Sequence, residues 1–293
     1  MGTKPDIVAH YRVENGKNFR LRDYDPADSG KLRLDKDAAR RRLQEGVMEL
    51  AELQGRLYAQ DQWALLLIFQ AMDAAGKDSV IKHVFSGVNP QGCEVHSFKV
   101  PSEQELDHDF LWRAAIRLPE RGRIGIFNRS YYEEVLVVRV HQELLGRQKL
   151  PAGLLGKKIW DRRFEDINAF EKHLWRNGTV VRKFFLNVSK EEQKKRFLER
   201  LDKPDKNWKF TERDVTERAC WGDYMRAYEE MIRATSTKHA PWHIVPADKK
   251  WFTQIVVAAT IVESLAALDL RYPALGPAEK RRLASLRRAL LKT

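Results

Sequence analysis

The fold of this chain is decided by residues 65–87, which read Leu-Leu-Leu-Ile-Phe-Gln-Ala-Met-Asp-Ala-Ala-Gly-Lys-Asp-Ser-Val-Ile-Lys-His-Val-Phe-Ser-Gly. The first five residues form an unbroken apolar run, which predicts a short strand buried on both faces. Small residues at positions 74–76 then allow a tight turn. From Lys77 onward apolar residues recur with helical spacing, and Gly87 is a typical helix stop. We therefore expect a strand, a small-residue loop, a lysine and a helix, in that order.

This order of elements is suited to binding phosphate, because loop N–H groups and the helix N-terminus carry partial positive charge. Lys77 would add a full charge. The motif G-x-x-x-x-G-K-[ST] is only partly met, since Ala71 replaces the first glycine and Asp78 replaces the metal-binding hydroxyl. The alternative is an ordinary buried strand, turn and helix with a solvated lysine. Asp73 favours the phosphate site. Phosphate repels a carboxylate inside a phosphate loop unless a metal ion lies between them, so Asp73 fits a loop that binds phosphate together with a metal ion.

Composition and length indicate a basic protein made of one large domain or of one domain with appendages. The chain has 293 residues, with 53 Lys and Arg against 41 Asp and Glu, and a net charge of +12. The charges are interspersed, which predicts a folded basic groove facing nucleic acid, an acidic membrane surface or a phosphate-rich ligand. The two cysteines, Cys93 and Cys220, provide no disulfide framework and favour a reducing cytoplasm. We see no signal peptide, and the late apolar run at 255–262 is too short to span a bilayer.

The remaining elements follow from periodicity and turn residues. Residues 1–35 are expected to form an extended or partly disordered arm, and Asp35 to cap the helix that follows. We expect further strands at 93–100, 123–127, 179–188 and within 241–247, and helices at 36–60, 103–118, 157–176, 190–201, 215–234 and 251–270. Residues 202–214 are polar and basic and are expected to form a mobile loop over a phosphate ligand.

A second group of polar residues follows the apolar strand at 123–127. Asn128 and Arg129 come directly after it, and Glu133 lies four residues beyond Arg129. Ligands collect at the carboxyl ends of strands in a doubly wound parallel sheet, so we expect Arg129 beside Lys77. The alternative is a surface loop with two acids and an arginine. His108 lies between two aspartates, but neighbouring side chains on a helix diverge, so we expect a solvated or salt-bridged face there.

Four motifs occur in order along the chain, at residues 72–78, 86–92, 127–130 and 208–210. Together they resemble the second family of polyphosphate kinases, over residues 35 to 270. Asn128 and Glu133 resemble the third class of that family, which phosphorylates both nucleoside monophosphates and diphosphates. Other classes commonly carry aspartate and asparagine at these two positions. Tyr131 departs from the histidine of the third class.

The resemblance implies a three-layer α/β/α P-loop kinase fold, similar to thymidylate kinases, with a parallel sheet and a helical lid. The domain would cover residues 36–272, with the lid at about 200–220, an arm at 1–35 and a basic tail at 273–293. The implied reaction is reversible transfer of the terminal phosphoryl group of polyphosphate to AMP and ADP, with Mg²⁺ or Mn²⁺ as cofactor. The implied partners are polyphosphate, adenine or guanine nucleotides and further copies in a homodimer or homotetramer, with no nucleic acid and no membrane.

The resemblance and the physical demands of phosphoryl transfer together assign roles to individual residues. The candidate catalytic residues are Asp73, Lys77, Arg129, Glu133 and Arg200, of which Asp73 and Glu133 are also the candidate metal ligands. The candidate substrate-binding residues are Ala74, Ala75, Gly76, Asp78, Lys82, Asn89, Asn128, Lys209 and Asp214. These roles agree with phosphoryl transfer, which needs alignment and neutralisation of charge. Arginines would bridge donor and acceptor phosphates as charge-assisted forks.

Two alternative functions remain open from the sequence. One is an ATP-dependent nucleotide or small-molecule kinase of the same fold, in which the basic surface is incidental. The other is a nucleic-acid-binding NTPase, although the sequence shows no internal repeat, no zinc spacing and no known binding module.

Overall fold

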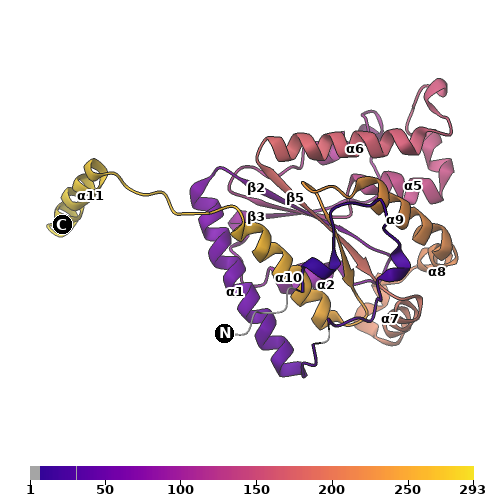
Figure 1. The fold of residues 1–293 in the computed structure, drawn as a ribbon, viewed down its shortest axis with the longest axis horizontal. Coiled ribbons are helices and arrows are strands. Elements are labelled where there is room, and N and C mark those ends of the chain that lie inside the picture. Colours follow the sequence, from indigo (N-terminus) through magenta and orange to yellow (C-terminus); the bar gives the residue numbers. More distant parts are fainter. Residues whose placement is uncertain (1–6, 31) are drawn as a thin grey trace.

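The computed structural model describes residues 7–30 and 32–293. The described chain is built around a six-stranded sheet with the order β1-β6-β5-β2-β4-β3 (Figure 1). Five strands run parallel, and β1 pairs antiparallel with β6 at one edge. The strands are β1 Arg12–Val13, β2 Ala64–Gln70, β3 Cys93–Ser97, β4 Ile124–Asn128, β5 Thr179–Asn187 and β6 Trp242–Pro246. The predicted α/β class with a mostly parallel sheet is confirmed.

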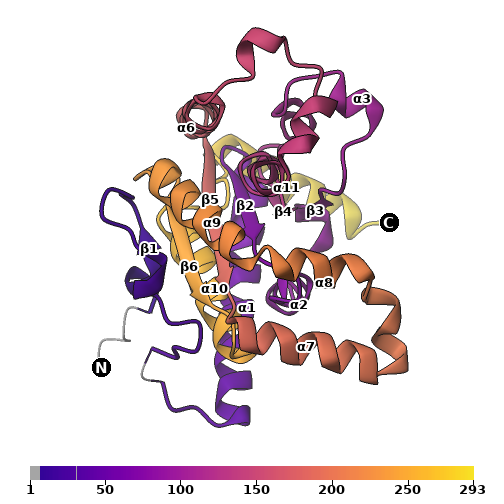
Figure 2. The same ribbon diagram turned by 90° about the vertical axis from the view of Figure 1, so that its right-hand side faces the viewer.

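Helices cover both faces of the sheet (Figures 1 and 2). The α-helices are α1 Lys36–Gln60, α2 Lys77–Val84, α3 Glu103–Leu106, α4 Trp112–Ala115, α5 Val137–Val140, α6 Ile159–Arg176, α7 Lys190–Asp202, α8 Glu212–Ala219, α9 Trp221–Thr235, α10 Lys250–Ala266 and α11 Pro277–Leu290. The 3-10 helices are Ala9–Tyr11, Leu21–Asp23, Pro90–Gly92, Tyr131–Val135, Gln142–Arg147, Ala152–Leu154 and Pro204–Lys209. Helix α10 packs against α1 and α2, and α6 packs against β5 and α9.

Strand β2 lies at the centre of the core. All seven of its residues are buried, and Leu65 pairs with Ile124 of β4 on one side and Val180 of β5 on the other. A strand covered by helices on both faces is apolar on both of its sides, which is why residues 64–69 do not alternate between apolar and polar. The strand predicted at 65–69 is thus confirmed and is one residue longer at each end.

Helix α1 is confirmed at the predicted bounds. The Asp35 carboxylate accepts a hydrogen bond from the Ala38 amide at 2.7 Å, and Asp61 ends the helix in the left-handed conformation. A carboxylate at this position satisfies a helix N–H group that otherwise has no partner. The capping signal at Asp35 therefore correctly predicted where this helix begins.

The single helix predicted at 103–118 is wrong, because the chain forms the two short helices α3 and α4. The Asp109 carboxylate accepts a hydrogen bond from the Leu111 amide at 2.9 Å, which offers the backbone an alternative to the helical pattern. His108 stacks on Trp112 with ring centroids 3.9 Å apart. No cluster of three or more His, Cys, Asp or Glu side chains suited to a metal ion occurs in the described part of the chain.

The helix predicted at 215–234 is also wrong as a single element. Helix α8 begins earlier, at Glu212, and α9 starts after a break at Cys220. The early start follows from Asp214, whose carboxylate accepts a hydrogen bond from the Thr211 amide at 2.8 Å. Most of the predicted loop at 202–214 is therefore the 3-10 helix Pro204–Lys209 together with the start of α8.

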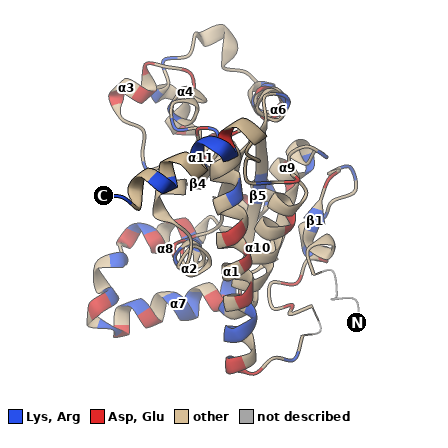
Figure 3. Ribbon diagram, turned by 90° about the vertical axis from the view of Figure 1, so that its left-hand side faces the viewer, with Lys and Arg blue, Asp and Glu red and all other residues tan. Residues whose placement is uncertain are grey.

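The two ends of the chain differ in their contacts. The described part of the N-terminal arm lies on the domain, where Arg12 pairs with His243 of β6. Residues 1–6 and 31 of the predicted arm lie outside the described residues. Helix α11 carries several arginines and stands away from the domain at the end of an extended segment, with none of its residues buried (Figures 1 and 3). None of the described helices has the length and apolar character needed to cross a membrane.

Candidate active site

The site begins where β2 and β4 end side by side. Phe69 pairs with Asn128 in parallel register, and the Arg129 amide donates a hydrogen bond to the Phe69 carbonyl at 3.0 Å. Residues 71–76, which we call the phosphate loop, leave β2 at this point and lead into α2. Because both strands are parallel, their polar ends meet at one edge of the sheet.

The phosphate loop holds two residues in the left-handed conformation. Ala74 has φ 60° and Gly76, the N-cap of α2, has φ 109°. Only glycine adopts such a φ without strain, whereas the left-handed conformation costs an alanine ~1–2 kcal/mol of conformational free energy. Alternating backbone conformations of this kind direct successive N–H groups into one concavity that binds anions. The loop geometry therefore supports the phosphate site over a plain strand and turn.

The Lys77 ammonium lies within this loop. Its Nζ donates hydrogen bonds to the carbonyls of Ala71 at 2.9 Å and Met72 at 3.5 Å. The pKa of Lys77 is lowered to about 8, mainly by burial and also by the nearby Arg129, against the opposing effect of the neighbouring carboxylates. A phosphate group placed here would favour the charged lysine, because it brings negative charge to a poorly solvated cation.

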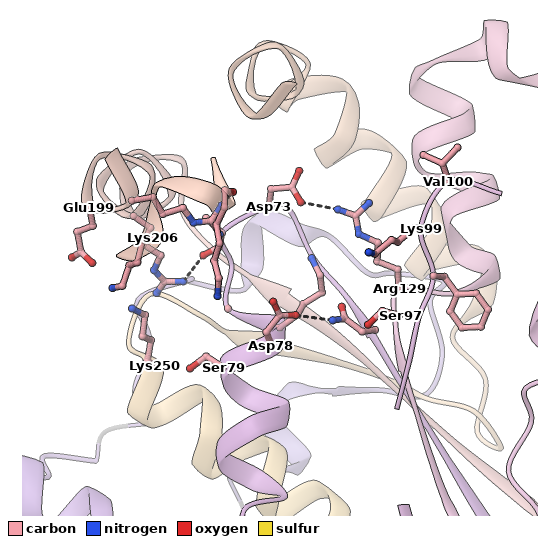
Figure 4. Close-up of a pocket in the computed structure, with 18 residues that line it drawn as sticks. Asp73, Asp78, Ser79, Ser97, Lys99, Val100, Arg129, Glu199, Lys206 and Lys250 are labelled. Atoms are coloured by element: carbon pink, nitrogen blue, oxygen red, sulfur yellow. Dashed lines mark hydrogen bonds and ion pairs between the residues drawn. The ribbon is translucent and has the colours of Figure 1, made fainter. Parts of the chain in front are cut away.

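Arg129 lies between two carboxylates. Its Nη2 donates a hydrogen bond to Asp73 Oδ1 at 2.7 Å (Figure 4). Its Nη1 lies 3.4 Å from Glu133 Oε2. Arg129 also has a left-handed φ of 65°, so the backbone is strained where this side chain leaves β4. Burial raises the pKa of Glu133, and Arg129 and Lys77 oppose that shift. The pairing of Glu133 with Arg129 is thus present in the structure.

Asn128 and Asp78 contact each other directly. The Asn128 side-chain amide donates a hydrogen bond to Asp78 Oδ1 at 2.7 Å (Figure 4). This bond joins the end of β4 to the first turn of α2. Two residues expected to contact substrate therefore also orient one another.

A cavity of about 570 Å³ opens over the phosphate loop, and we call it the basic cavity. Eight cationic side chains and three carboxylates line it. The cations are Lys77, Lys99, Arg129, Arg196, Arg200, Lys206, Lys209 and Lys250, and the carboxylates are Asp73, Asp78 and Glu199. Lys206 and Lys250 lie on one side of it, and Lys99 and Arg129 on the other (Figure 4). An excess of cations around a concave surface favours a polyanionic ligand.

A second cavity of about 540 Å³, which we call the apolar cavity, adjoins the first. The two share Asp73, Phe98, Lys99, Val100, Arg129 and Lys209. The wall of the apolar cavity is rich in apolar and aromatic side chains, including Met72, Phe98, Val100, Pro101, Leu106, Phe110, Val137, Leu144, Tyr224 and Tyr228. Glu133 and Asp214 also line it. The Asp73–Arg129 pair therefore stands at the junction of a charged cavity and a largely apolar one.

The lid residues lie close together. Arg200 of α7 donates a hydrogen bond to the Lys209 carbonyl at 3.3 Å and lies 3.9 Å from the Asp214 carboxylate. Arg200 lines the basic cavity and Asp214 the apolar one. In Figure 2, α7 and α8 appear as two arms joined by the 3-10 helix Pro204–Lys209. These arms form the helical lid.

Three predicted substrate-binding residues lie outside the lining of both cavities. Lys82 projects from the exposed side of α2. The Asn89 side chain accepts a hydrogen bond from the Gln91 amide at 3.0 Å and caps the 3-10 helix Pro90–Gly92. Ala75 is buried in the core. Asn89 and Ala75 thus have structural explanations, and the geometry brings none of the three to the wall of either cavity.

Sequence reasoning missed four cations of the basic cavity, namely Lys99, Arg196, Lys206 and Lys250. Arg196 is only 5% exposed, although it lies in a helix rich in Lys and Arg. Its place on the buried face with Gln193 and Phe197 was a helical-spacing signal that could have identified it.

Tyr131 contributes to the wall of the apolar cavity, but its hydroxyl faces the core. It donates a hydrogen bond to Glu171 Oε1 at 2.9 Å, and Lys183 Nζ donates to Glu171 Oε2 at 2.6 Å. Lys183 also donates to the Thr235 carbonyl at 2.7 Å, so this buried ion pair is supported by further hydrogen bonds. Removing one partner of such a pair costs ~3–5 kcal/mol. The tyrosine therefore belongs to a buried support beneath the site.

Comparison with known proteins identifies the family. A family model described as "Polyphosphate kinase 2 (PPK2)" matches residues 33–272. The chain belongs to the polyphosphate kinase 2 family. This match covers the phosphate loop, the Arg129 segment and the lid of this kinase and ends before α11. The family predicted from the four motifs is thus confirmed.

Two curated relatives of this family member match over nearly their full length. The ADP-polyphosphate phosphotransferase of Rhodopseudomonas palustris is 50% identical over 284 residues, which is 94% of this chain and 98% of the relative. The AMP/ADP-polyphosphate phosphotransferase of Meiothermus ruber is 44% identical over 263 residues, or 90% and 94% of the two chains.

A solved structure confirms the fold of this polyphosphate kinase 2. The crystal structure of polyphosphate kinase 2 from Arthrobacter aurescens TC1 superposes with a TM-score of 0.84 at 40% identity. It covers 93% of this chain and 95% of the other. The predicted P-loop kinase fold is therefore confirmed.

Proposed function

We propose that this protein transfers phosphoryl groups from inorganic polyphosphate to AMP and ADP. The observation that carries this proposal is the junction of the basic and apolar cavities at Asp73 and Arg129. One cavity suits a polyanionic chain and the other suits a nucleoside. The names of the Rhodopseudomonas palustris and Meiothermus ruber relatives describe the same type of transfer.

The donor is proposed to lie in the basic cavity. A polyphosphate chain carries negative charge along its length, and cations surround this cavity from the phosphate loop to Lys250. Lys77 and the loop amides would hold the phosphates nearest the reaction. Lys206 and Lys250, farther along the wall, would hold the rest of the chain.

The acceptor is proposed to lie in the apolar cavity. Its volume of about 540 Å³ falls in the range typical of small-ligand pockets. The base and ribose would contact apolar side chains such as Phe98, Val100 and Tyr224. The nucleotide phosphate would then point to Arg129 and Lys209, which both cavities share.

The proposed reaction is a direct displacement. An oxygen of the acceptor phosphate attacks the terminal phosphorus of polyphosphate, and the bond from that phosphorus to the bridging oxygen breaks. The products are the extended nucleotide and a chain shorter by one phosphate. The attacking oxygen is already anionic, so no strong base is needed. Arg129, Lys77 and Arg200 would align the groups and stabilise charge on the migrating phosphoryl group.

We propose Mg²⁺ as the cofactor, with Asp73 and Glu133 as the protein ligands. Both carboxylates line the apolar cavity at its junction with the basic one, and Asp78 lies nearby in the basic cavity. No cluster of three or more metal-ligating side chains exists among the described residues, so substrate phosphates would have to complete the coordination shell. Mg²⁺ commonly binds through one or two carboxylates plus phosphate oxygens. The bound ion would neutralise phosphate charge.

Three further properties extend this proposal. We propose a homodimer or homotetramer, a cytoplasmic location and no nucleic-acid partner. The free thiols of Cys93 and Cys220 are consistent with a reducing compartment.

The decisive experiment compares phosphoryl donors. The protein is incubated with AMP and Mg²⁺ and with either polyphosphate or ATP, and the nucleotides are then separated. Formation of ADP and ATP with polyphosphate is the expected result. Activity with ATP alone would instead favour an ATP-dependent kinase, and phosphate release stimulated by DNA or RNA would favour a nucleic-acid-dependent NTPase.

A further inference from the structure

Arg196 of α7 binds backbone carbonyls of the phosphate loop. Its Nη1 donates hydrogen bonds to the carbonyls of Ala74 at 3.1 Å and Ala75 at 2.8 Å. Its Nη2 donates to the carbonyls of Ala247 at 2.6 Å and Asp248 at 3.1 Å. Its Nε donates to a Glu192 carboxylate oxygen at 2.9 Å.

Arginine has five N–H donors, so these five contacts occupy all of the donors of Arg196. The guanidinium therefore lies at the wall of the basic cavity without a donor left for a phosphate. Its role is to fasten the phosphate loop to the segment that follows β6. This is the fixed attachment of the loop.

Gln193 provides a second attachment of the same loop. It lies one turn before Arg196 on the buried face of α7 and is 1% exposed. Its Nε2 donates a hydrogen bond to the Asp73 carbonyl at 2.9 Å, and its Oε1 accepts one from Arg218 Nη1 at 2.8 Å. Arg218 belongs to α8 and also donates to the Lys190 carbonyl at 2.7 Å. A hydrogen-bonded chain thus connects α8, α7 and the phosphate loop.

The series of hydrogen bonds from α8 to the phosphate loop joins two functionally distinct places. At one end, the Asp73 carboxylate accepts the hydrogen bond of Arg129 at the junction of the cavities. At the other end, α8 supplies Asp214 and Glu217 to the wall of the apolar cavity. A displacement of α8 would therefore reach the backbone of Asp73 through one buried amide side chain.

We propose that Gln193 is a positioning residue that couples the lid helix α8 to the phosphate loop. Occupation of the apolar cavity sets the position of α8, and Gln193 transmits that position to Asp73 while Arg196 holds the rest of the loop. This inference rests on the proposed function only for the identity of donor and acceptor. Misplacement of reacting groups by about 1 Å can cost ~10²-fold in rate, so even a small displacement matters.

A double-mutant cycle with Gln193→Met and Arg218→Met tests the coupling. Gln193→Met should lower kcat by ~10-fold or more while the KM for polyphosphate changes little, because alignment and not ground-state binding is lost. Arg218→Met should lower kcat less. The double variant should be no slower than Gln193→Met, because both changes break the same series of hydrogen bonds between α8 and the phosphate loop. Losses that multiply, or an unchanged kcat with only a lower Tm, would overturn the proposal.

Two further variants separate coupling from general destabilisation. Gln193→Glu can still accept the hydrogen bond of Arg218 but cannot donate to the Asp73 carbonyl, so it should lose kcat as Gln193→Met does. Lys195→Met is the matched control on the exposed side of α7, where Lys195 makes one 3.7 Å contact with Glu192. It should keep the kcat of the unmodified protein. A Gln193→Glu variant with unchanged kcat would contradict the proposed role.

Hydrogen exchange provides a test that needs no turnover. AMP alone should slow amide exchange at residues 72–78 in the unmodified protein, and Arg218→Met should weaken this protection although Arg218 lines neither cavity. Equal protection in both proteins would overturn the coupling. If polyphosphate fails as donor, the mutant cycle is run with ATP, so failure of the proposed function is distinguishable from failure of the coupling.

Discussion

Arg129 Nη2 donates a hydrogen bond to Asp73 Oδ1 at 2.7 Å, and this bond joins the loop after β2 to the end of β4. The two side chains are 37% and 35% exposed. An ion pair with that exposure contributes little to folding stability, typically ~0–1 kcal/mol. Its position at the junction of two cavities gives it instead the role of orienting charge toward a ligand.

The first prediction concerns the phosphate loop. Lys77→Ala and Asp73→Asn should each lower kcat/KM by ~10²–10³-fold, because each removes a group that stabilises charge or positions it. Circular dichroism and Tm should remain close to those of the unmodified protein, since neither side chain is part of the apolar core. Near-normal turnover in either variant would show that the active site has been misplaced.

The second prediction is a pH dependence from Lys77. Its pKa of about 8 in the free protein lies below the ordinary lysine value, mainly because of burial. The ammonium is charged below that pH and neutral above it, so kcat/KM for polyphosphate should fall as the pH rises through about 8. Lys77→Arg keeps its charge and should not show this decline, whatever its absolute rate. The same decline in Lys77→Arg would assign the pH effect to another group.

Much of the fold could be predicted because its signals are local. The apolar run of β2 and the cap at Asp35 each determine an element from a few adjacent residues. The break between α3 and α4 could not be predicted from spacing alone, because it depends on Asp109 bonding the Leu111 amide in place of the helical pattern. The start of α8 was missed although its signal is local, since Thr211 and Asp214 form a capping box three residues apart.

The active site was predictable to the extent that a parallel sheet brings strand ends together. That rule predicted, from the sequence alone, that Arg129 lies near the phosphate loop. It did not identify Arg196. Helical spacing with Gln193 and Phe197 could have placed this arginine on the buried face of α7, but its partners include the carbonyls of Ala247 and Asp248, and a backbone carbonyl is present at every position and leaves no sequence signal. Lys99 and Lys250 line the basic cavity, but no sequence feature distinguishes them from the other Lys and Arg residues, of which the chain has 53 in total.

The third prediction is a difference in salt sensitivity between the two substrates. The apparent affinity for polyphosphate should fall steeply with added salt, because the many cations that line the basic cavity would contact one long polyanion. The affinity for AMP should fall much less, since AMP offers one phosphate. Initial rates across a potassium chloride series measure both. Replacing Lys206 and Lys250 together by Met should flatten the polyphosphate curve alone. Equal salt sensitivity for both substrates would contradict a basic cavity devoted to the polymer.

The fourth prediction concerns Glu133 and acceptor choice. Asn128 is neutral at the end of β4 and donates its amide hydrogen to Asp78, so it brings no negative charge for a metal ion. Glu133 lines the adjoining cavity and is 22% exposed, with Arg129 at 3.4 Å. If Mg²⁺ binds between the two phosphate groups, Glu133 is the carboxylate that replaces the missing charge. AMP would then depend on Glu133 more than ADP does, because AMP would bring one fewer phosphate to the metal.

Glu133→Gln should therefore lower AMP phosphorylation more than ADP phosphorylation, and added Mg²⁺ should partly restore the rate with AMP. Initial rates with each acceptor across a magnesium series provide the measurement. Glu134→Gln is the matched control from the wall of the same cavity. Glu134 is paired with Arg163 at 3.1 Å and not with Arg129, so its loss should lower Tm without changing the ratio of the two rates. If Glu133→Gln slows both acceptors equally and magnesium does not help, then Glu133 only holds Arg129 in place. The charge argument for dual acceptor use would then have no support from this residue.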